Sequence, residues 1–133
     1  MDGVRLTVRV DFGSARALGP GKIRLLEAIG KTGSISQAGR SLDMSYRRAW
    51  LLVDDLNHCF REPVVTTQPG GAQGGGAALT PFGLDLIAKY RSIETQATAA
   101  TRLQLHALEV SLRHRDRRGQ KRLKTSIKSA VAR

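Results

Sequence analysis

Apolar and polar residues alternate near the N-terminus. Val4, Leu6, Val8 and Val10 are separated by charged or hydroxyl side chains. A period of two places every second side chain on the same face of an extended chain. The pattern therefore predicts a strand over residues 4–11 with one buried face.

The period then changes to that of a helix. Apolar residues recur between Ile23 and Ile29 at helical spacing, after the break formed by residues 19–21. Glycine often ends a helix, because it adopts the left-handed conformation without strain. We expect this helix to end near Gly30 or Gly33.

The next stretch predicts two short helices joined by a tight turn. Ser34 can cap the first helix, and Gln37 can complete a capping box with it. Ser45 can cap the second helix. Asp43, between them, tolerates the positive φ that a turn without glycine requires. A helix-turn-helix over about residues 34–59 follows, and such a unit can place its second helix in the DNA major groove. Its small or apolar side is formed by Ala38, Leu42, Ala49, Val53 and Leu56.

A hairpin is expected after the second helix. Strand-like residues on both sides of a glycine-rich loop at 70–76 predict a β-hairpin, or wing, over residues 63–79. The loop carries no Lys or Arg, so contact with DNA would use backbone N–H groups, including that of Gly74, and Gln68 or Gln73. The alternative is a flexible linker.

Thr80-Pro81 is a strong helix start, and apolar residues then form two stripes. The first stripe contains Phe82, Leu86, Tyr90 and Ile93, and the second contains Leu103, Ala107 and Val110 with Leu105, Leu108 and Leu112. So much apolar surface on a helix leaving a small domain needs a partner. We expect residues 80–112 to form a dimerisation helix or helices. The alternative is that the later part folds back on its own domain, with a break near residues 95–98.

Charge is concentrated at the C-terminus. The chain has 133 residues, enough for one domain with extensions, and a formal net charge of +11. Residues 113–133 hold nine Lys or Arg and one acid, so the rest of the chain carries only +3. This tail is predicted to be disordered, and it either attracts phosphates without regard to sequence or only solubilises the protein.

The sequence offers little for catalysis. Cys59 is the single cysteine, and it excludes an intramolecular disulfide and a Cys-pair metal site. His58, His106 and His114 show no arrangement with it that would support an enzyme, so we expect no catalytic residue, cofactor or metal. No signal peptide or membrane-spanning run is apparent, which predicts a cytoplasmic protein without a membrane partner.

Arg47 is the first choice for reading bases, since the N-terminal turn of a recognition helix reaches base edges and arginine can bind guanine O6 and N7. Tyr46 and Arg48 flank it. The phosphate contacts are expected from residues near helix N-termini, namely Ser34, Ser36, Gln37 and Ser45. The alternatives are a solvated helix face for the two arginines and a packing role for the aromatic residues. We take Trp50 as structural.

Several of these motifs resemble the N-terminal DNA-binding domain of the ModE family, which comprises molybdate-responsive bacterial transcription regulators. They are Gly-Ser-Ile-Ser-Gln-Ala and Ser-Tyr-x-x-Ala-Trp within residues 33–50, Gly-Gly-x-x-Gly-Gly-Gly at 70–76, Ala78-Leu79-Thr80 and Gly83-Leu84. The similarity runs from about residue 21 to residue 93. It implies a LysR-type winged helix whose dimer is built chiefly by the helix after the wing. Full-length ModE proteins also carry C-terminal oxyanion-binding domains, which nothing here matches, so binding of molybdate or another oxyanion is doubtful.

We therefore expect a mainly α protein with a small β wing. Residues 1–94 would form a winged helix-turn-helix domain, followed by the helices of residues 80–112 and the tail of residues 113–133. The predicted function is a homodimeric, sequence-specific transcription regulator of the ModE type on double-stranded DNA, linked to molybdenum or oxyanion metabolism. Its operator would be pseudo-palindromic. The alternative is a sequence-independent nucleic-acid-binding protein driven by the tail.

Overall fold

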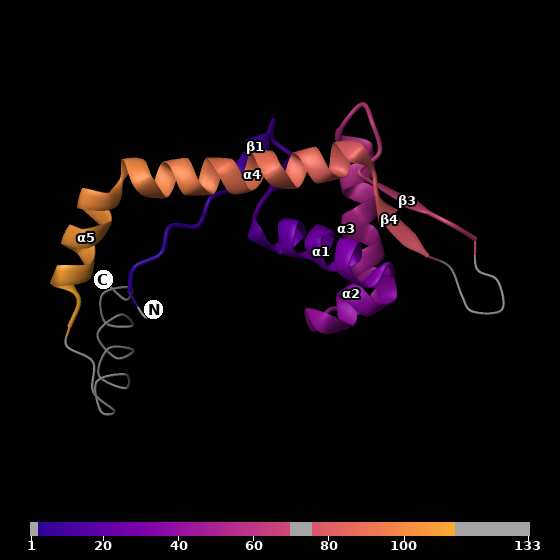
Figure 1. The fold of residues 1–133 in the computed structure, drawn as a ribbon, viewed down its shortest axis with the longest axis horizontal. Coiled ribbons are helices and arrows are strands. Elements are labelled where there is room, and N and C mark those ends of the chain that lie inside the picture. The colour runs from indigo at the N-terminus through magenta and orange to yellow at the C-terminus, as the bar shows by residue number, and fades with distance from the viewer. Residues whose placement is uncertain (1–2, 70–75, 114–133) are drawn as a thin grey trace. The chain divides into compact units, whose positions relative to one another are not determined.

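The computed structural model describes residues 3–69 and 76–113. They fall into two units, residues 6–98 and residues 99–113 with residues 3–5, and each is described by itself. The described chain is mainly helical, with two small antiparallel sheets (Figure 1). In chain order its elements are β1 (Val10–Phe12), β2 (Arg16–Leu18), α1 (Pro20–Thr32), α2 (Ile35–Ser41), α3 (Tyr46–Cys59), β3 (Val65–Thr67), β4 (Ala77–Leu79), α4 (Pro81–Ala100) and α5 (Arg102–Ser111).

The predicted N-terminal strand over residues 4–11 is wrong in its extent. Only the three residues of β1 are extended in a sheet, and they pair with β2 in a hairpin that turns at Gly13, where φ is 67°. Alternation alone does not form a strand, since the backbone also needs a neighbouring strand for its hydrogen bonds. Val8 instead offers its carbonyl oxygen to the Tyr90 hydroxyl, at 2.5 Å.

Helix α1 follows the prediction. Pro20 stands in its first turn, where a missing N–H costs nothing. Gly33 ends it with φ 71°, and its N–H donates to the Ile29 carbonyl oxygen at 2.8 Å. Helices α1, α2 and α3 pack together around one core (Figure 1). The residues of these three helices that form the apolar core are Ile23, Leu25, Leu26, Ile29, Ile35, Ala38, Ala49, Val53 and Leu56.

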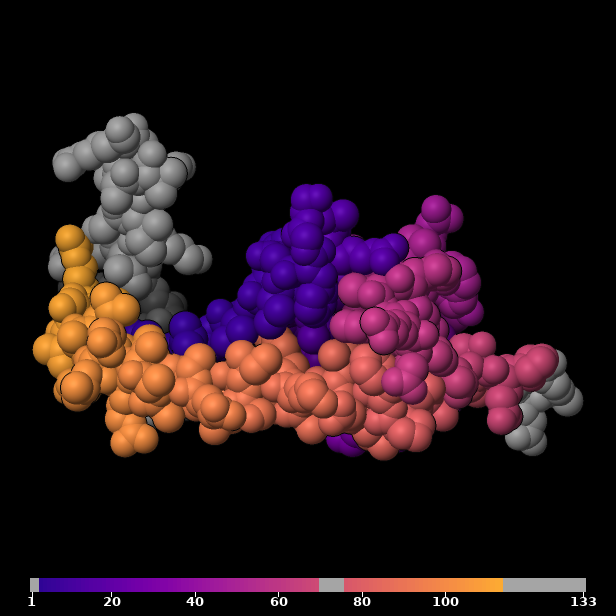
Figure 2. Space-filling model, turned by 90° about the horizontal axis from the view of Figure 1, so that it is seen from above, coloured from indigo at the N-terminus to yellow at the C-terminus, as the bar shows by residue number. Residues whose placement is uncertain are grey.

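A chain of aromatic rings joins the N-terminal hairpin to the rest of this unit. The ring centroids of Phe12 and Phe60 are 5.5 Å apart, and those of Phe60 and Phe82 are 5.3 Å apart, both in edge-to-face geometry. Figure 2 shows the hairpin, in indigo, next to α4 on the face seen from above. The hairpin therefore belongs to the same packed unit as the helices.

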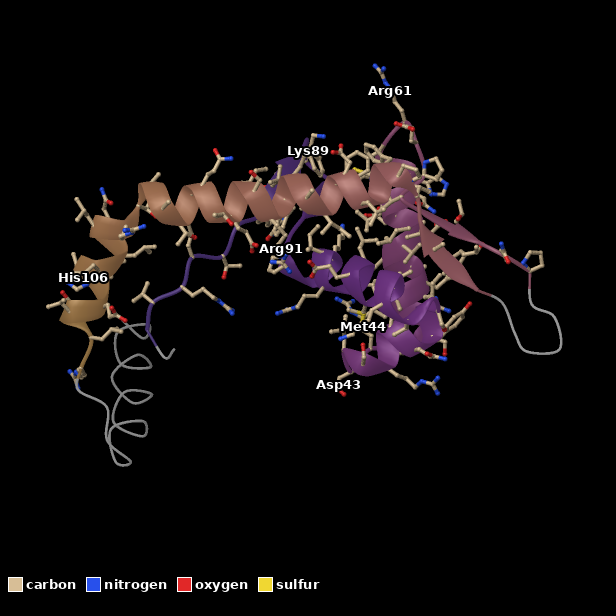
Figure 3. All side chains as sticks on the ribbon, in the orientation of Figure 1. Asp43, Met44, Arg61, Lys89, Arg91 and His106 are labelled. Atoms are coloured by element: carbon tan, nitrogen blue, oxygen red, sulfur yellow. The ribbon has the colours of Figure 1, made fainter. Side chains whose placement is uncertain are left out.

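Most of the first apolar stripe is covered within its own chain, although Ile93 is 44% exposed. Leu86 and Tyr90 of α4 are buried within their own chain, because this helix packs on the core of residues 6–98. Arg91 adds a polar link between α4 and α1 (Figure 3). It donates to both carboxylate oxygens of Glu27, at 3.1 and 2.7 Å, and to Glu94 at 2.6 Å. The hydrogen bond with Glu27 is the largest cause of a raised pKa of the Arg91 guanidinium.

The break between the C-terminal helices lies at Thr101, not near residues 95–98 as the alternative proposed. The polar residues at 95–98 continue α4, since hydroxyl side chains can hydrogen-bond backbone carbonyls one turn earlier, as Thr95 does with Arg91. In α5 no residue is buried, and Leu103 is 81% exposed. The partner for this second stripe stays a prediction. No helix in the described ranges is both long enough and apolar enough to cross a membrane.

Candidate nucleic-acid interface

Two serines cap the helices on either side of the expected DNA-binding turn. Ser34 Oγ accepts from the Gln37 N–H, and Ser45 Oγ accepts from the Arg48 N–H, both at 3.1 Å. The reciprocal half of the capping box is wrong. The Ser34 N–H donates to Thr32 Oγ1 at 3.3 Å, so a neighbouring side chain occupies the donor expected for Gln37.

In the turn between α2 and α3, the residue with positive φ is not a glycine. Asp43 has φ 57°, as predicted, and lies at the outer tip of the turn, while Met44 packs against the core (Figure 3). Gly39 sets how closely the helices approach. A Cβ on Gly39 would lie 3.0 Å from the Ala49 Cβ and 3.4 Å from the Met44 carbonyl oxygen. The two helices therefore come closest at Gly39, which follows Ala38, the small residue predicted for this crossing.

Helix α3 buries one side and exposes the other, as the helical period predicts. Ala49, Val53 and Leu56 are 0–4% exposed. Arg47 lies on the opposite side, and both it and Arg48 are exposed. No ion pair involves either arginine within the described chain, so both cations remain available to an anionic partner.

One of the two acids of α3 is paired with cations. Asp55 pairs with Lys22 at 3.1 Å and Arg16 at 3.5 Å, while Asp54 lies 3.5 Å from His58 Nδ1, which is charged only when it is protonated. These carboxylates lie in the later turns of the helix. The first two turns of α3 therefore form its cationic part.

The predicted site residues occupy two helix starts and the hairpin. Ser34 and Ser36 are half-buried at the start of α2, while Gln37, Ser45, Tyr46, Arg47 and Arg48 are exposed. Gln73 and Gly74 lie outside the described residues. At the loop end of the hairpin, the backbone N–H of the exposed Gln68 donates to the Gly76 carbonyl oxygen at 2.9 Å. The structure thus places both helix starts in one unit, since α2 packs on α3.

Sequence reasoning did not include three exposed residues, Trp50, Leu51 and Arg40, among the site residues, although the helical period places Leu51 on the side opposite the core. Trp50 was taken as structural, yet it is 44% exposed, and Leu51 beside it is 47% exposed. Arg40, in the last turn of α2, is also exposed. The signal was available for Trp50, because residues four apart lie on the same helix face and Tyr46 was already placed at the interface.

Asn57 fixes the hairpin to α3. Its side-chain N–H donates to the Val65 carbonyl oxygen at 3.0 Å, and its Oδ1 accepts from the N–H groups of Val64 and Val65 at 2.7 and 3.1 Å. One amide side chain thus satisfies three backbone groups, as a neighbouring strand would. The start of β3 is therefore held at a defined place along the helix that carries Arg47.

Comparison with known proteins gives the relationship of this chain. No family model matches it. Over 77 residues it is 52% identical to the molybdenum-pterin-binding protein MopB of Rhodobacter capsulatus, covering 58% of this chain and 28% of MopB. Over 96 residues it is 41% identical to the molybdenum transport protein ModE of Azotobacter vinelandii, covering 72% of this chain and 35% of that protein. This part of the chain is ModE-like.

A third relative is named for regulation. The chain is 39% identical over 71 residues to the DNA-binding transcriptional dual regulator ModE of Escherichia coli K12, covering 53% of this chain and 27% of the regulator. The chain spans about a third or less of the length of these three relatives. None of the three carries the name of an enzyme.

The expectation about oxyanions needs correction. Binding of molybdate or another oxyanion was considered doubtful because no residues matched a sensor domain. Two of these relatives are named for binding or transporting molybdenum, so that doubt is wrong. The reasoning failed because it weighed only the motifs of a sensor domain. Among the described residues no three His, Cys, Asp or Glu side chains gather as a metal site.

Proposed function

We propose that this chain carries the DNA-binding unit of a molybdenum-linked transcription regulator of the ModE type. In this proposal the unit is a LysR-type winged helix-turn-helix, with α2 and α3 as the two helices and β3–β4 as the wing. It binds double-stranded DNA as a homodimer on a pseudo-palindromic operator.

One observation carries the proposal. The first two turns of α3 present Arg47 and Arg48 without acidic partners, on a helix whose opposite side is buried and whose start is fixed by Ser45. A helix held in this way can insert its N-terminal residues in the major groove. The hairpin beside it supplies a second contact to the DNA backbone.

The relatives supply the biological context. One is named a DNA-binding transcriptional regulator, one a molybdenum transport protein and one a molybdenum-pterin-binding protein. Together the names support regulation that responds to molybdenum. For this chain we propose that DNA binding is linked to molybdate.

The test is binding to the DNA upstream of its own gene and to a shuffled duplex at ~150 mM salt, where loose electrostatic attraction is weakened. We expect a strong preference for the upstream DNA. Arg47→Ala should weaken specific binding and relax base preference, since an arginine-guanine contact contributes about 1–3 kcal/mol of discrimination. Arg61→Ala is the matched control, because Arg61 is an exposed arginine beyond the other end of α3 (Figure 3).

Equal, weak and steeply salt-dependent binding to both duplexes would contradict the proposal and favour binding driven by the basic tail. The molybdenum link is tested with sodium molybdate, with sodium sulfate at equal ionic strength as the control. If molybdate neither changes DNA affinity nor binds in calorimetry, the link does not operate through this chain.

A further inference from the structure

Large apolar side chains are exposed in the first two turns of α3. Tyr46 is 58% exposed, Trp50 44% and Leu51 47%. The other side of the helix already supplies the core, so these residues are not needed there. Exposed apolar groups grouped on one short surface indicate a contact with another molecule.

The apolar groups lie on both sides of Arg47. With a rotation of about 100° per residue, Trp50 falls roughly 60° to one side of Arg47 and Leu51 roughly 40° to the other. On the Leu51 side the surface is hollowed, with a cavity volume of about 170 Å³, between Leu51, Leu52 and the start of the helix. One cation is therefore flanked by two apolar positions on a single helix face.

The charges around this face indicate its occupant. Arg40, Arg47 and Arg48 are exposed, and none of the three forms an ion pair within the part of the chain that is described. A nucleic acid brings the phosphates that such cations attract. In the major groove it also offers an apolar group, because the 5-methyl of thymine projects there beside polar base edges.

We propose that Trp50 and Leu51 read thymine through its 5-methyl group, on either side of the base that Arg47 contacts. This inference rests on the proposed function, and it names thymine as a base that the protein recognises next to the base contacted by Arg47. Trp50 is then a specificity-determining residue. Tyr46, one turn earlier on the same face as Trp50, extends the apolar contact toward the sugar and the next base.

The experiment removes the methyl group from the DNA. Thymines of the preferred duplex are replaced one at a time by deoxyuridine, which pairs identically but lacks the 5-methyl. We expect at least one position at which the wild-type protein loses about fourfold in affinity, the value for one buried methyl-sized group. Trp50→Ala or Leu51→Ala should bind more weakly overall and lose this sensitivity at its own position.

Leu84→Ala is the matched control, since Leu84 is a 58% exposed leucine of α4, and it should keep the full sensitivity to deoxyuridine. Far-UV circular dichroism checks the folding of each variant. The wild-type protein gives a readout that needs no variant, because Trp50 is its single tryptophan. Its fluorescence should be protected from acrylamide quenching by the preferred duplex more than by the shuffled one.

The possible failures are distinguishable. A protein that prefers no duplex at all contradicts the proposed function itself. A protein that prefers its own duplex, yet binds every deoxyuridine version equally well, overturns only the reading of thymine. Retention of the deoxyuridine sensitivity by both folded variants would also overturn it.

Discussion

Replacing Asn57 by alanine should lower the free energy of unfolding by about 2–4 kcal/mol. The substitution removes three hydrogen bonds to the backbone of β3 and its preceding residue. The side chains of Val64 and Val65 are 0% and 2% exposed, so these backbone groups lie next to the core. Each buried polar group without a partner costs about 1–3 kcal/mol. Three such groups give a range of about 3–9 kcal/mol, and we expect a value near or just below its low end, because Asn57 is only half-buried and water can reach some of the groups.

The assay is urea unfolding followed by far-UV circular dichroism. Asn57→Asp keeps the acceptors for the two N–H groups but loses the donor to Val65, so its loss should be intermediate. Gln68→Ala, at an exposed side chain of the same hairpin, should change stability by no more than about 0.5 kcal/mol. A loss below about 0.5 kcal/mol for Asn57→Ala would refute the reasoning, since the hydrogen bonds would then contribute nothing net.

Two other predictions concern the packing and titration of α4. Gly83→Ala should cost about 2–4 kcal/mol, because a Cβ there would lie 2.3 Å from the Val64 carbonyl oxygen. At Gly21 in α1 an added Cβ would have no atom within 4 Å, so Gly21→Ala should be neutral or raise stability by up to about 1 kcal/mol. Similar melting temperatures for the two variants would contradict the packing argument. Burial raises the pKa of the Tyr90 hydroxyl above its ordinary value. The stability that the neutral Tyr90 hydroxyl contributes is therefore fully present below about pH 10. It is lost as the pH rises through the folded-state pKa, because the hydroxyl of the unfolded chain releases its proton at a lower pH. Tyr90→Phe should therefore flatten the alkaline decline of stability in urea titrations, and an unchanged decline would assign it to other groups.

Local structure was predictable where its cause is local in sequence. The two serine caps and the positive φ of Asp43 depend on partners within a few residues, so the sequence contains all that determines them. The exposure of Arg47 followed from the helical period alone. The exchange of partners at Ser34 was missed, because Thr32 competes with Gln37 and only the geometry of the turn decides between them.

Long-range partners were not predictable. The alternation at residues 4–11 indicates that one side is covered, but it does not say whether a strand or a helix covers it. Tyr90 shows the same limit. Its apolar stripe was predicted to contact a second chain, yet Leu86 and Tyr90 are buried within their own chain, while Ile93 is 44% exposed. The exposure of Trp50 depends on how other elements fill the core. The spacing of apolar residues thus shows that one face of an element is covered, but it does not identify the element or chain that covers it.

The attachment of the β3–β4 hairpin has a further consequence, for aggregation. An exposed strand edge invites pairing with a strand of another chain. Here the Asn57 side chain hydrogen-bonds the N–H and C=O of Val65 that point away from β4. On β4, the Ala77 N–H donates to the Gly33 carbonyl oxygen at 2.9 Å. Both edges are thus occupied where the hairpin joins the helices. If two copies bind one DNA molecule as proposed, their high local concentration should not lead this part of the hairpin to add strands to its neighbour.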